Sequence, residues 1–298
     1  MIDAWILFTL GAALMQSVRT AGQKSLSGAL SPMSTTLVRY VFGLPLVIAY
    51  AAWLTGQALL PALQAAMANG RFLVFASLAS VAQIAATALL VMAFGQRNFT
   101  VATSFAKTEA LQTAALGTVL FQVALSGWGW LAVALGVGGV FIIGIPLHGQ
   151  RWDTRGVLFG TLSGTAFALT SLWLREASFA LGTEALPSAA LTLLCMVSLQ
   201  SLLCLLWTAT REPGEFGRIV TRWPLALFVG VTSAAGSIGW FTAIRLQNPA
   251  LVKSLGQVEV LFTIALTVFV FRERISGREL IGVAAIVGSV VMLLLIDS

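Results

Sequence analysis

Ten apolar stretches of 19 or more residues follow one another along this chain of 298 residues. A helix rises about 1.5 Å per residue, so each stretch is long enough to cross the roughly 30 Å hydrocarbon core of a bilayer. The stretches lack the alternation of polar and apolar residues that marks membrane β-strands, and a helix satisfies its backbone hydrogen bonds internally. We therefore predict ten transmembrane helices, at residues 4–26, 32–55, 71–95, 99–122, 127–147, 155–180, 186–209, 223–245, 249–271 and 278–296.

The composition of the chain favours lipid over water as its surroundings. Apolar residues make up 58% of the chain and charged residues only 9%, whereas about a quarter of the residues in a soluble domain are charged. The arginines lie in short connectors and form no continuous basic face, which argues against binding to nucleic acid. Because the connectors are short, we expect no appended soluble domain, and the lipid bilayer is the expected partner.

The second half of the chain repeats the first at one constant offset. Moving the sequence by 150 residues aligns Asn98 with Asn248 and Glu109 with Glu259. The same offset continues through the next span, where it aligns Gly138 with Gly288. We therefore predict that the two halves of the chain are related copies.

The number of spans in each copy determines how the copies are oriented. Residues 1–148 and 149–298 each carry five predicted spans, and an odd number forces the second copy to enter the membrane from the opposite side. Inverted repeats of this kind are typical of transporters, which expose one central site to each side in turn. The predicted fold is an all-α integral membrane protein, with ten transmembrane helices arranged as two inverted five-helix repeats around a central cavity.

Two of the predicted helices carry polar residues deep in the membrane. Lys107 lies about 14 Å into the membrane, where a lysine costs roughly 2.5–3.5 kcal/mol unless it finds a partner or a wet cavity. In a continuous helix Lys107 and Glu109 point about 200° apart, so they cannot both face one cavity. The polar residues of interest are Thr103, Lys107 and Glu109 in the fourth span, and Lys253, Gln257 and Glu259 in the ninth.

We predict that Thr103, Lys107 and Lys253 face the central cavity and bind a substrate. Glu109 and Glu259 are predicted to bond to neighbouring helices, as structural or coupling carboxylates. Alternatively, Lys107 and both glutamates form buried ion pairs that fix the packing of the helices. The other candidates for substrate binding are glutamines and aromatic residues inside the spans, namely Gln83, Gln257, Phe167 and Trp240.

Two arginines lie toward the ends of their spans. Arg19 belongs to the first span and Arg39 to the start of the second. Long cationic side chains near a helix end commonly extend to the interface between lipid and water. We therefore interpret both arginines as interfacial residues, outside the candidate site.

Short motifs in the second half resemble those of the drug/metabolite transporter superfamily, specifically its EamA-type exporters. The sequence Glu259-Val260-Leu261-Phe262 resembles the family's Glu-Pro motif, and Arg272-Glu273 resembles its Gly-Glu connector. The chain departs from the family pattern where Val260 replaces the usual proline and Arg272 the usual glycine. The resemblance covers the whole chain and extends to the aromatic amino-acid exporter group. It implies a bacterial inner-membrane protein that exports bulky neutral amino acids by alternating access.

Other functions were weighed against amino-acid export. A proton-coupled exporter of cationic drugs or other metabolites is the alternative, with Glu109 or Glu259 as the carboxylate that carries the proton. Paired aspartates, histidine metal clusters and nucleophile motifs are absent from the sequence, so we expect neither an enzyme nor a cofactor or bound metal. A purely structural membrane subunit is a further alternative. The pattern is compatible with a monomer that binds a small-molecule substrate.

The orientation of the termini stays open. Arginines and lysines are concentrated in the connectors on the side opposite the N-terminus, and the positive-inside tendency would place both termini outside. The family resemblance implies instead that both termini lie in the cytoplasm.

Overall fold

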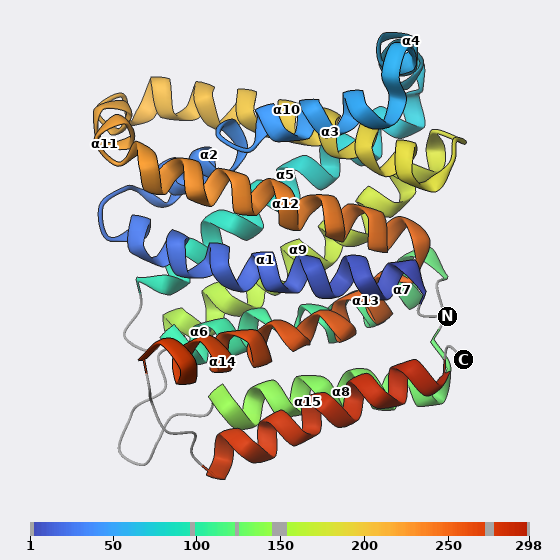
Figure 1. The fold of residues 1–298 in the computed structure, drawn as a ribbon, viewed down its shortest axis with the longest axis vertical. Coiled ribbons are helices and arrows are strands. Elements are labelled where there is room, and N and C mark those ends of the chain that lie inside the picture. The colour runs from blue at the N-terminus through green and yellow to red at the C-terminus, as the bar shows by residue number, and fades with distance from the viewer. Residues whose placement is uncertain (1–2, 96–98, 123–124, 145–153, 272–276, 297–298) are drawn as a thin grey trace.

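The computed structural model describes residues 3–95, 99–122, 125–144, 154–271 and 277–296, and within them every regular element is a helix (Figure 1). Each of the ten predicted spans corresponds to one helix or to a chain of shorter ones, and two further short helices, Leu59–Ala68 and Glu215–Thr221, lie in predicted connectors. In the first half these are α1 (Ala4–Ser27), α2 (Pro32–Val41), α3 (Leu44–Thr55), η1 (Gly56–Ala58), α4 (Leu59–Ala68), α5 (Gly70–Phe94), α6 (Phe99–Ala106), α7 (Glu109–Phe121) and α8 (Gly127–Gly144). In the second half they are α9 (Thr154–Ala180), α10 (Ala185–Arg211), α11 (Glu215–Thr221), α12 (Trp223–Leu246), α13 (Pro249–Leu255), η2 (Gly256–Val258), α14 (Glu259–Phe271) and α15 (Gly277–Ile296).

Three of the predicted spans are interrupted helices. The second is divided between α2 and α3, the fourth between α6 and α7, and the ninth between α13 and α14. By length and hydropathy alone, six of the described helical stretches suffice to cross a membrane. The other predicted spans are more polar, interrupted or shorter, and they carry Lys107, Glu109, Lys253 and Glu259.

Corresponding helices of the two halves make corresponding contacts with the other half or their own. Helix α1 packs along α12, and α9, its counterpart in the second half, packs along α5, the counterpart of α12. The last helices, α8 and α15, pack against each other. At their crossing, a Cβ atom on Gly139 would lie 2.7 Å from the carbonyl oxygen of Gly282, and a Cβ on Gly282 would lie 2.6 Å from that of Gly139. Only glycine allows this close approach, which suits association between helices in lipid.

The first helices of the two halves point in opposite directions (Figure 1). After α1 ends, the Ser31 backbone N–H donates to Glu215 Oε2 (2.8 Å), so this end lies near the end of α10. In contrast, α9 ends next to the start of α10, where Asn69 Nδ2 donates to the Ala180 carbonyl oxygen (2.8 Å). The ends of α1 and α9 therefore lie at opposite ends of α10, as inverted repeats require.

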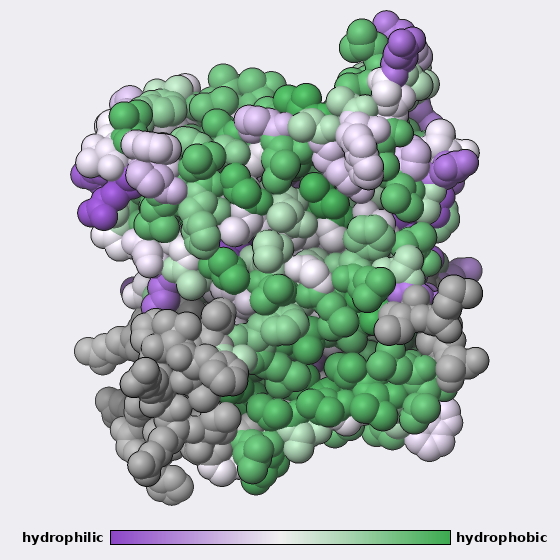
Figure 2. All heavy atoms as spheres, in the orientation of Figure 1, coloured by the Kyte–Doolittle hydropathy of each residue, from purple (hydrophilic) through white to green (hydrophobic). Residues whose placement is uncertain are grey.

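The surface of the molecule suits a lipid environment. On the face shown in Figure 2, hydrophobic residues cover the middle of the helices, and hydrophilic residues gather toward the helix ends. Large apolar side chains such as Trp53, Val119 and Leu295 are largely exposed. Many of the buried residues are instead polar, among them Arg19, Gln23 and Arg39.

Candidate functional site

The fourth span breaks at its most polar point. Helix α6 ends at Ala106, Lys107 and Thr108 form a turn, and α7 begins at Glu109. The turn is tightened by hydrogen bonds from Lys107 N to the Ser104 carbonyl oxygen (3.1 Å) and from Thr108 N to the Phe105 carbonyl oxygen (3.2 Å). Lys107 and Glu109 consequently line the same hollow. Our prediction that they face apart was wrong, because it assumed an unbroken helix.

The ninth span breaks at the equivalent place. The 3₁₀ turn Gly256–Val258 separates α13 from α14, which begins at Glu259. Gly256 is required here because a Cβ atom would lie 3.0 Å or less from the Trp240 indole ring. The break brings Gln257 and Glu259 to the hollow that Lys253 also lines.

Two ion pairs join the halves across this region. Lys253 Nζ lies 2.8 Å from Glu109 Oε1, and Lys107 Nζ contacts Glu259 Oε2. Each pair takes its lysine from one half and its glutamate from the other, and all four side chains are mostly buried. Buried ion pairs were the alternative interpretation of Lys107 and the glutamates, and the structure confirms that they form. It also shows that Lys253, predicted only as a cavity residue, is a member of the set.

Two further residues connect the ion pairs. Trp240 Nε1 donates to Gln16 Oε1 (2.9 Å), and Gln16 Nε2 donates to Glu259 Oε2 (2.7 Å). The Trp240 ring also lies under Lys253, with Nζ 4.3 Å from its centroid, a distance at which cation–π attraction contributes. Gln16 was not among the predicted site residues, and only its position on a polar helix could have indicated it. Together these residues form one ion-pair network, consisting of Gln16, Lys107, Glu109, Trp240, Lys253 and Glu259.

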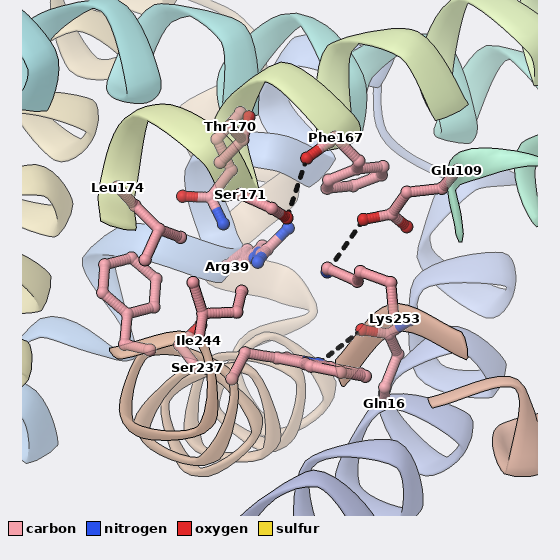
Figure 3. Close-up of a pocket in the computed structure, with 13 residues that line it drawn as sticks. Gln16, Arg39, Glu109, Phe167, Thr170, Ser171, Leu174, Ser237, Ile244 and Lys253 are labelled. Atoms are coloured by element: carbon pink, nitrogen blue, oxygen red, sulfur yellow. Dashed lines mark hydrogen bonds and ion pairs between the residues drawn. The ribbon is translucent and has the colours of Figure 1, made fainter. Parts of the chain in front are cut away.

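A central cavity lies beside the network, between the two halves (Figure 3). About 410 Å³ of space there is not filled by protein atoms, but the space is narrow, with room for only about two water molecules. Seven helices contribute to its walls. The lining residues are Gln16, Arg39, Gln83, Glu109, Phe167, Thr170, Ser171, Leu174, Ser237, Trp240, Phe241, Ile244 and Lys253.

The structure brings together most of the residues predicted for substrate binding. Gln83, Phe167, Trp240 and Lys253 line the central cavity. A smaller adjoining hollow of about 260 Å³ contains Lys107 and Gln257 among its lining residues. Thr103 lines neither of these two hollows.

The amide oxygen of Gln83 is already engaged within the protein. It accepts a hydrogen bond of 2.7 Å from Gln200 Nε2 of α10, and Gln200 is itself fully buried. The bond holds the Gln83 amide at the cavity wall in a fixed orientation. A solute would therefore find the Gln83 side chain positioned in advance.

The two arginines that we expected at the interface are buried in the protein. Arg19 is 2% exposed and Arg39 is 5% exposed. Arg39 lines the central cavity, and its Nη1 donates to Thr87 Oγ1 (2.7 Å). For Arg39 the interpretation failed because α2 is enclosed by α5, α10 and α12, so the Arg39 guanidinium group has no route to the membrane surface. Distance from the end of an apolar stretch does not reveal such enclosure.

Comparison with known proteins gives one family and one fold. The model of the EamA-like transporter family matches residues 3–145 and again residues 154–295. An uncharacterised transporter of Synechocystis sp. is 24% identical over 189 residues, which is 59% of this chain and 57% of that protein. The chain thus spans little more than half the length of this relative. A crystal structure with 17% sequence identity superposes with a TM-score of 0.73 over 98% of this chain and 97% of the other, a likeness of fold alone.

Proposed function

The chain belongs to the EamA-like transporter family, and from this premise we propose that it exports amino acids, aromatic and other bulky neutral ones among them, across a bacterial inner membrane. As a multi-pass membrane protein with two matches to the family model, it has the two-repeat architecture that such a carrier needs. We propose a boundary between the repeats at residues 148 and 149. We also propose that one chain is the working unit, because the central cavity lies within it.

The observation that carries the proposal is the set of chemical groups in the central cavity. An amino acid presents a carboxylate, an ammonium group and, in the bulky members, an apolar body. The cavity offers the cationic groups of Arg39 and Lys253, the carboxylate of Glu109, and the aromatic rings of Phe167 and Trp240. Each part of the solute therefore finds a group of complementary charge or polarity.

The ion pairs suggest how a solute would pass. With room for only about two water molecules, the cavity must widen before an amino acid enters. Widening separates Lys253 from Glu109, and leaving one member of a buried pair without its partner typically costs about 3–5 kcal/mol. A zwitterion can compensate these charges, because its ammonium group can approach Glu109 while its carboxylate faces the cationic groups of Arg39 and Lys253. In this proposal the solute replaces the pair, and the two inverted halves then expose it to each side alternately.

Export of cationic drugs is less well supported. It requires a glutamate that exchanges a proton for a cation. Glu109 and Glu259 are each already paired with a lysine, so both carboxylates have compensating charges within the protein. A cation would have to displace a lysine without providing an anion in return.

Reconstituted liposomes test the proposal. We expect purified protein to release preloaded radiolabelled phenylalanine, tryptophan, threonine or methionine faster than protein-free vesicles do. The Glu109→Gln variant should release them more slowly than the wild type, whereas Lys24→Gln, which removes an exposed charge at the end of α1, should match it. If no amino acid is released faster, the proposal is wrong. A pH gradient applied to the same vesicles determines whether protons drive the movement.

A further inference from the structure

Two buried arginines in the centre of the molecule have no acidic partner in the part of the chain that the structure describes. The lysines of the ion-pair network are each matched by a glutamate. Within the described part of the chain, no carboxylate forms an ion pair with Arg19 or Arg39, although both guanidinium groups are almost fully buried. Two positive charges therefore lack a paired carboxylate among the described residues, in a region with little access to water. Burial of a charge is unfavourable unless a partner of opposite charge is present.

The two guanidinium groups belong to one site. A Cβ atom on Gly43, one helical turn after Arg39, would lie 3.3 Å from Ala234 Cβ of α12, and one on Gly22, close to Arg19, would lie 2.8 Å from Val229 Cγ2. Both arginines therefore belong to helices that pack against the same stretch of α12. Neither Glu109 nor Glu259 forms an ion pair with Arg19. A nearby group of opposite charge favours the charged form of such a residue.

Further polar groups around Arg19 lack partners. Arg19 Nε and both polar atoms of the Gln23 amide are buried without a hydrogen bond. Arg19 and Gln23 lie one turn apart, so they share one face of α1. Ser233 Oγ of α12 is also buried without a partner. Buried polar groups are normally satisfied, so unsatisfied ones that occur together offer hydrogen bonds to a bound water, ion or ligand.

The packing of α1 against α12 places Ser233 at the level of Arg19. A Cβ atom on Gly22 would lie 2.8 Å from Val229 Cγ2, and one on Gly236 would lie 3.5 Å from Met15 Cβ. Residue numbers thus rise along α1 as they fall along α12. Ser233, about midway between Val229 and Gly236, therefore lies beside Arg19, about midway between Gly22 and Met15.

Arg39 connects this group to the central cavity. Its side chain lies among the residues that line the cavity in Figure 3. A guanidinium group has five N–H donors in a planar fork, and the described residues accept one hydrogen bond from Arg39, at Thr87. The Tyr40 ring lies 5.4 Å from Arg39 Cζ and restricts the position of the guanidinium group. Arg39 therefore has donors to spare at the cavity wall.

We propose that Arg39 and Arg19 form a binding site for the carboxylate group of the transported solute. An arginine fork matches the two oxygens of a carboxylate, and the bound anion neutralises the charge that the protein leaves uncompensated. Gln23 and Ser233 supply further hydrogen bonds, and the apolar body lies against Phe167 and Trp240. The inference rests on the proposed transport function and deepens it. The substrate class becomes organic acids with an apolar body, for which the carboxylate contributes more to binding than the amine.

A set of related small molecules tests this preference with the wild-type protein. Binding is measured by titration calorimetry in lipid nanodiscs for L-phenylalanine, 3-phenylpropanoate, L-phenylalaninamide, 2-phenylethylamine and inorganic phosphate. We expect the two carboxylates to bind about tenfold or more tightly than the two amines, since a lost hydrogen bond to a charged group has at least this effect. Equal or tighter binding of 2-phenylethylamine, binding of phosphate alone, or no binding of either carboxylate would overturn the proposal.

Variants connect the carboxylate preference to the arginines. Arg39→Gln and Arg19→Gln should each weaken binding of 3-phenylpropanoate about tenfold or more, and Arg39→Lys should retain part of it. Arg245→Gln is the matched control, because Arg245 is bonded to Ser188 Oγ and the Thr183 carbonyl oxygen, away from the cavity lining. Unchanged binding by well-folded Arg39→Gln and Arg19→Gln proteins contradicts the proposal. If these variants do not fold, the comparison of ligands on the wild type decides.

The two proposals can fail separately. If phenylalanine is not exported but 3-phenylpropanoate binds in a manner that depends on Arg39, the carboxylate site stands and amino-acid export falls. If phenylalanine is exported but removal of its carboxylate leaves binding unchanged, export stands and the carboxylate site falls.

Discussion

Lys253 of the second half and Glu109 of the first form an ion pair, with 2.8 Å between Nζ and Oε1. The other pair takes its lysine, Lys107, from the first half and its glutamate, Glu259, from the second. The two pairs are not copies of each other, although their glutamates align at the 150-residue offset. At that offset Lys253 aligns with Thr103, and Lys107 aligns with Gln257. The two repeats thus carry the glutamate at the same position, but the lysine of the second repeat lies one helical turn earlier than the lysine of the first.

Removing one member of the central pair should destabilise the protein strongly. In Glu109→Gln, the Lys253 charge stays mostly buried without its partner, and we expect a loss of about 3–5 kcal/mol. The exposed pair between Arg71 and Glu176 offers a matched control, because surface pairs contribute about 0–1 kcal/mol. Thermal unfolding of the purified proteins should show a clearly lower Tm for Glu109→Gln and little change for Glu176→Gln. Similar Tm values for both variants would mean that the central pair is not buried as described.

Removing both members should restore much of that stability. In the double variant Lys253→Gln with Glu109→Gln, no charge is left alone, and two amides of similar size can bond to each other. We expect the double variant to unfold at a higher temperature than either single variant. A double-mutant cycle on the three proteins measures the coupling. Additive losses, with the double variant least stable, would show that the two residues do not interact.

Two adjacent glycines of α8 should respond differently to alanine. The added Cβ at position 139 would meet the Gly282 carbonyl oxygen of α15 at 2.7 Å, whereas nothing lies within 4 Å of the same atom at position 138. Gly139→Ala should therefore destabilise the protein by about 1–3 kcal/mol through overpacking. Gly138→Ala should be neutral or stabilising by up to about 1 kcal/mol, because alanine favours the helix. Equal effects on Tm at both positions would show that α15 does not pack against α8 at Gly139.

Links between the halves at either end of the molecule should stop transport. The first half meets the second at one end through Ser31 and Glu212, and at the other through Arg71 and Glu176. Alternating exposure of a central site requires each of these ends to open in turn during every cycle.

Cysteines at Ser31 and Glu212, in a protein whose native cysteines are replaced, allow a short cleavable cross-linker to hold one end closed. We expect liposome efflux to stop on cross-linking and to return when the linker is cleaved. The control is the same double-cysteine protein treated with a monofunctional thiol reagent of similar size. Undiminished efflux after complete cross-linking would rule out separation of the halves at that end, and the Arg71 and Glu176 positions would then be tested in the same way.

Much of the fold was predictable because the hydropathy of each apolar stretch, over a length that crosses the bilayer, determines that it forms a membrane helix. The predicted span 223–245 and helix α12 (Trp223–Leu246) differ by one residue, and 4–26 and α1 (Ala4–Ser27) agree as closely. The breaks in the helices were not predicted. At Lys107 the sequence contains neither glycine nor proline, and the turn exists because the polar side chains on either side of it find partners in the other half.

By itself, the sequence determined how many spans the chain makes, where the described spans begin and end to within a few residues, and that its halves enter the membrane from opposite sides. Length and hydropathy are sufficient to locate each span, because they are properties of a single segment. The odd number of spans in each half is sufficient for the inversion, because it depends only on the order of the segments. Only the tertiary structure decided that Lys253 pairs with Glu109 and that Arg19 and Arg39 form no ion pair with any carboxylate of the described residues. The helical period determines which residues share a face, but the neighbour that this face meets depends on packing between segments far apart in the chain. The partner of a buried charge is therefore a property of the assembled helices.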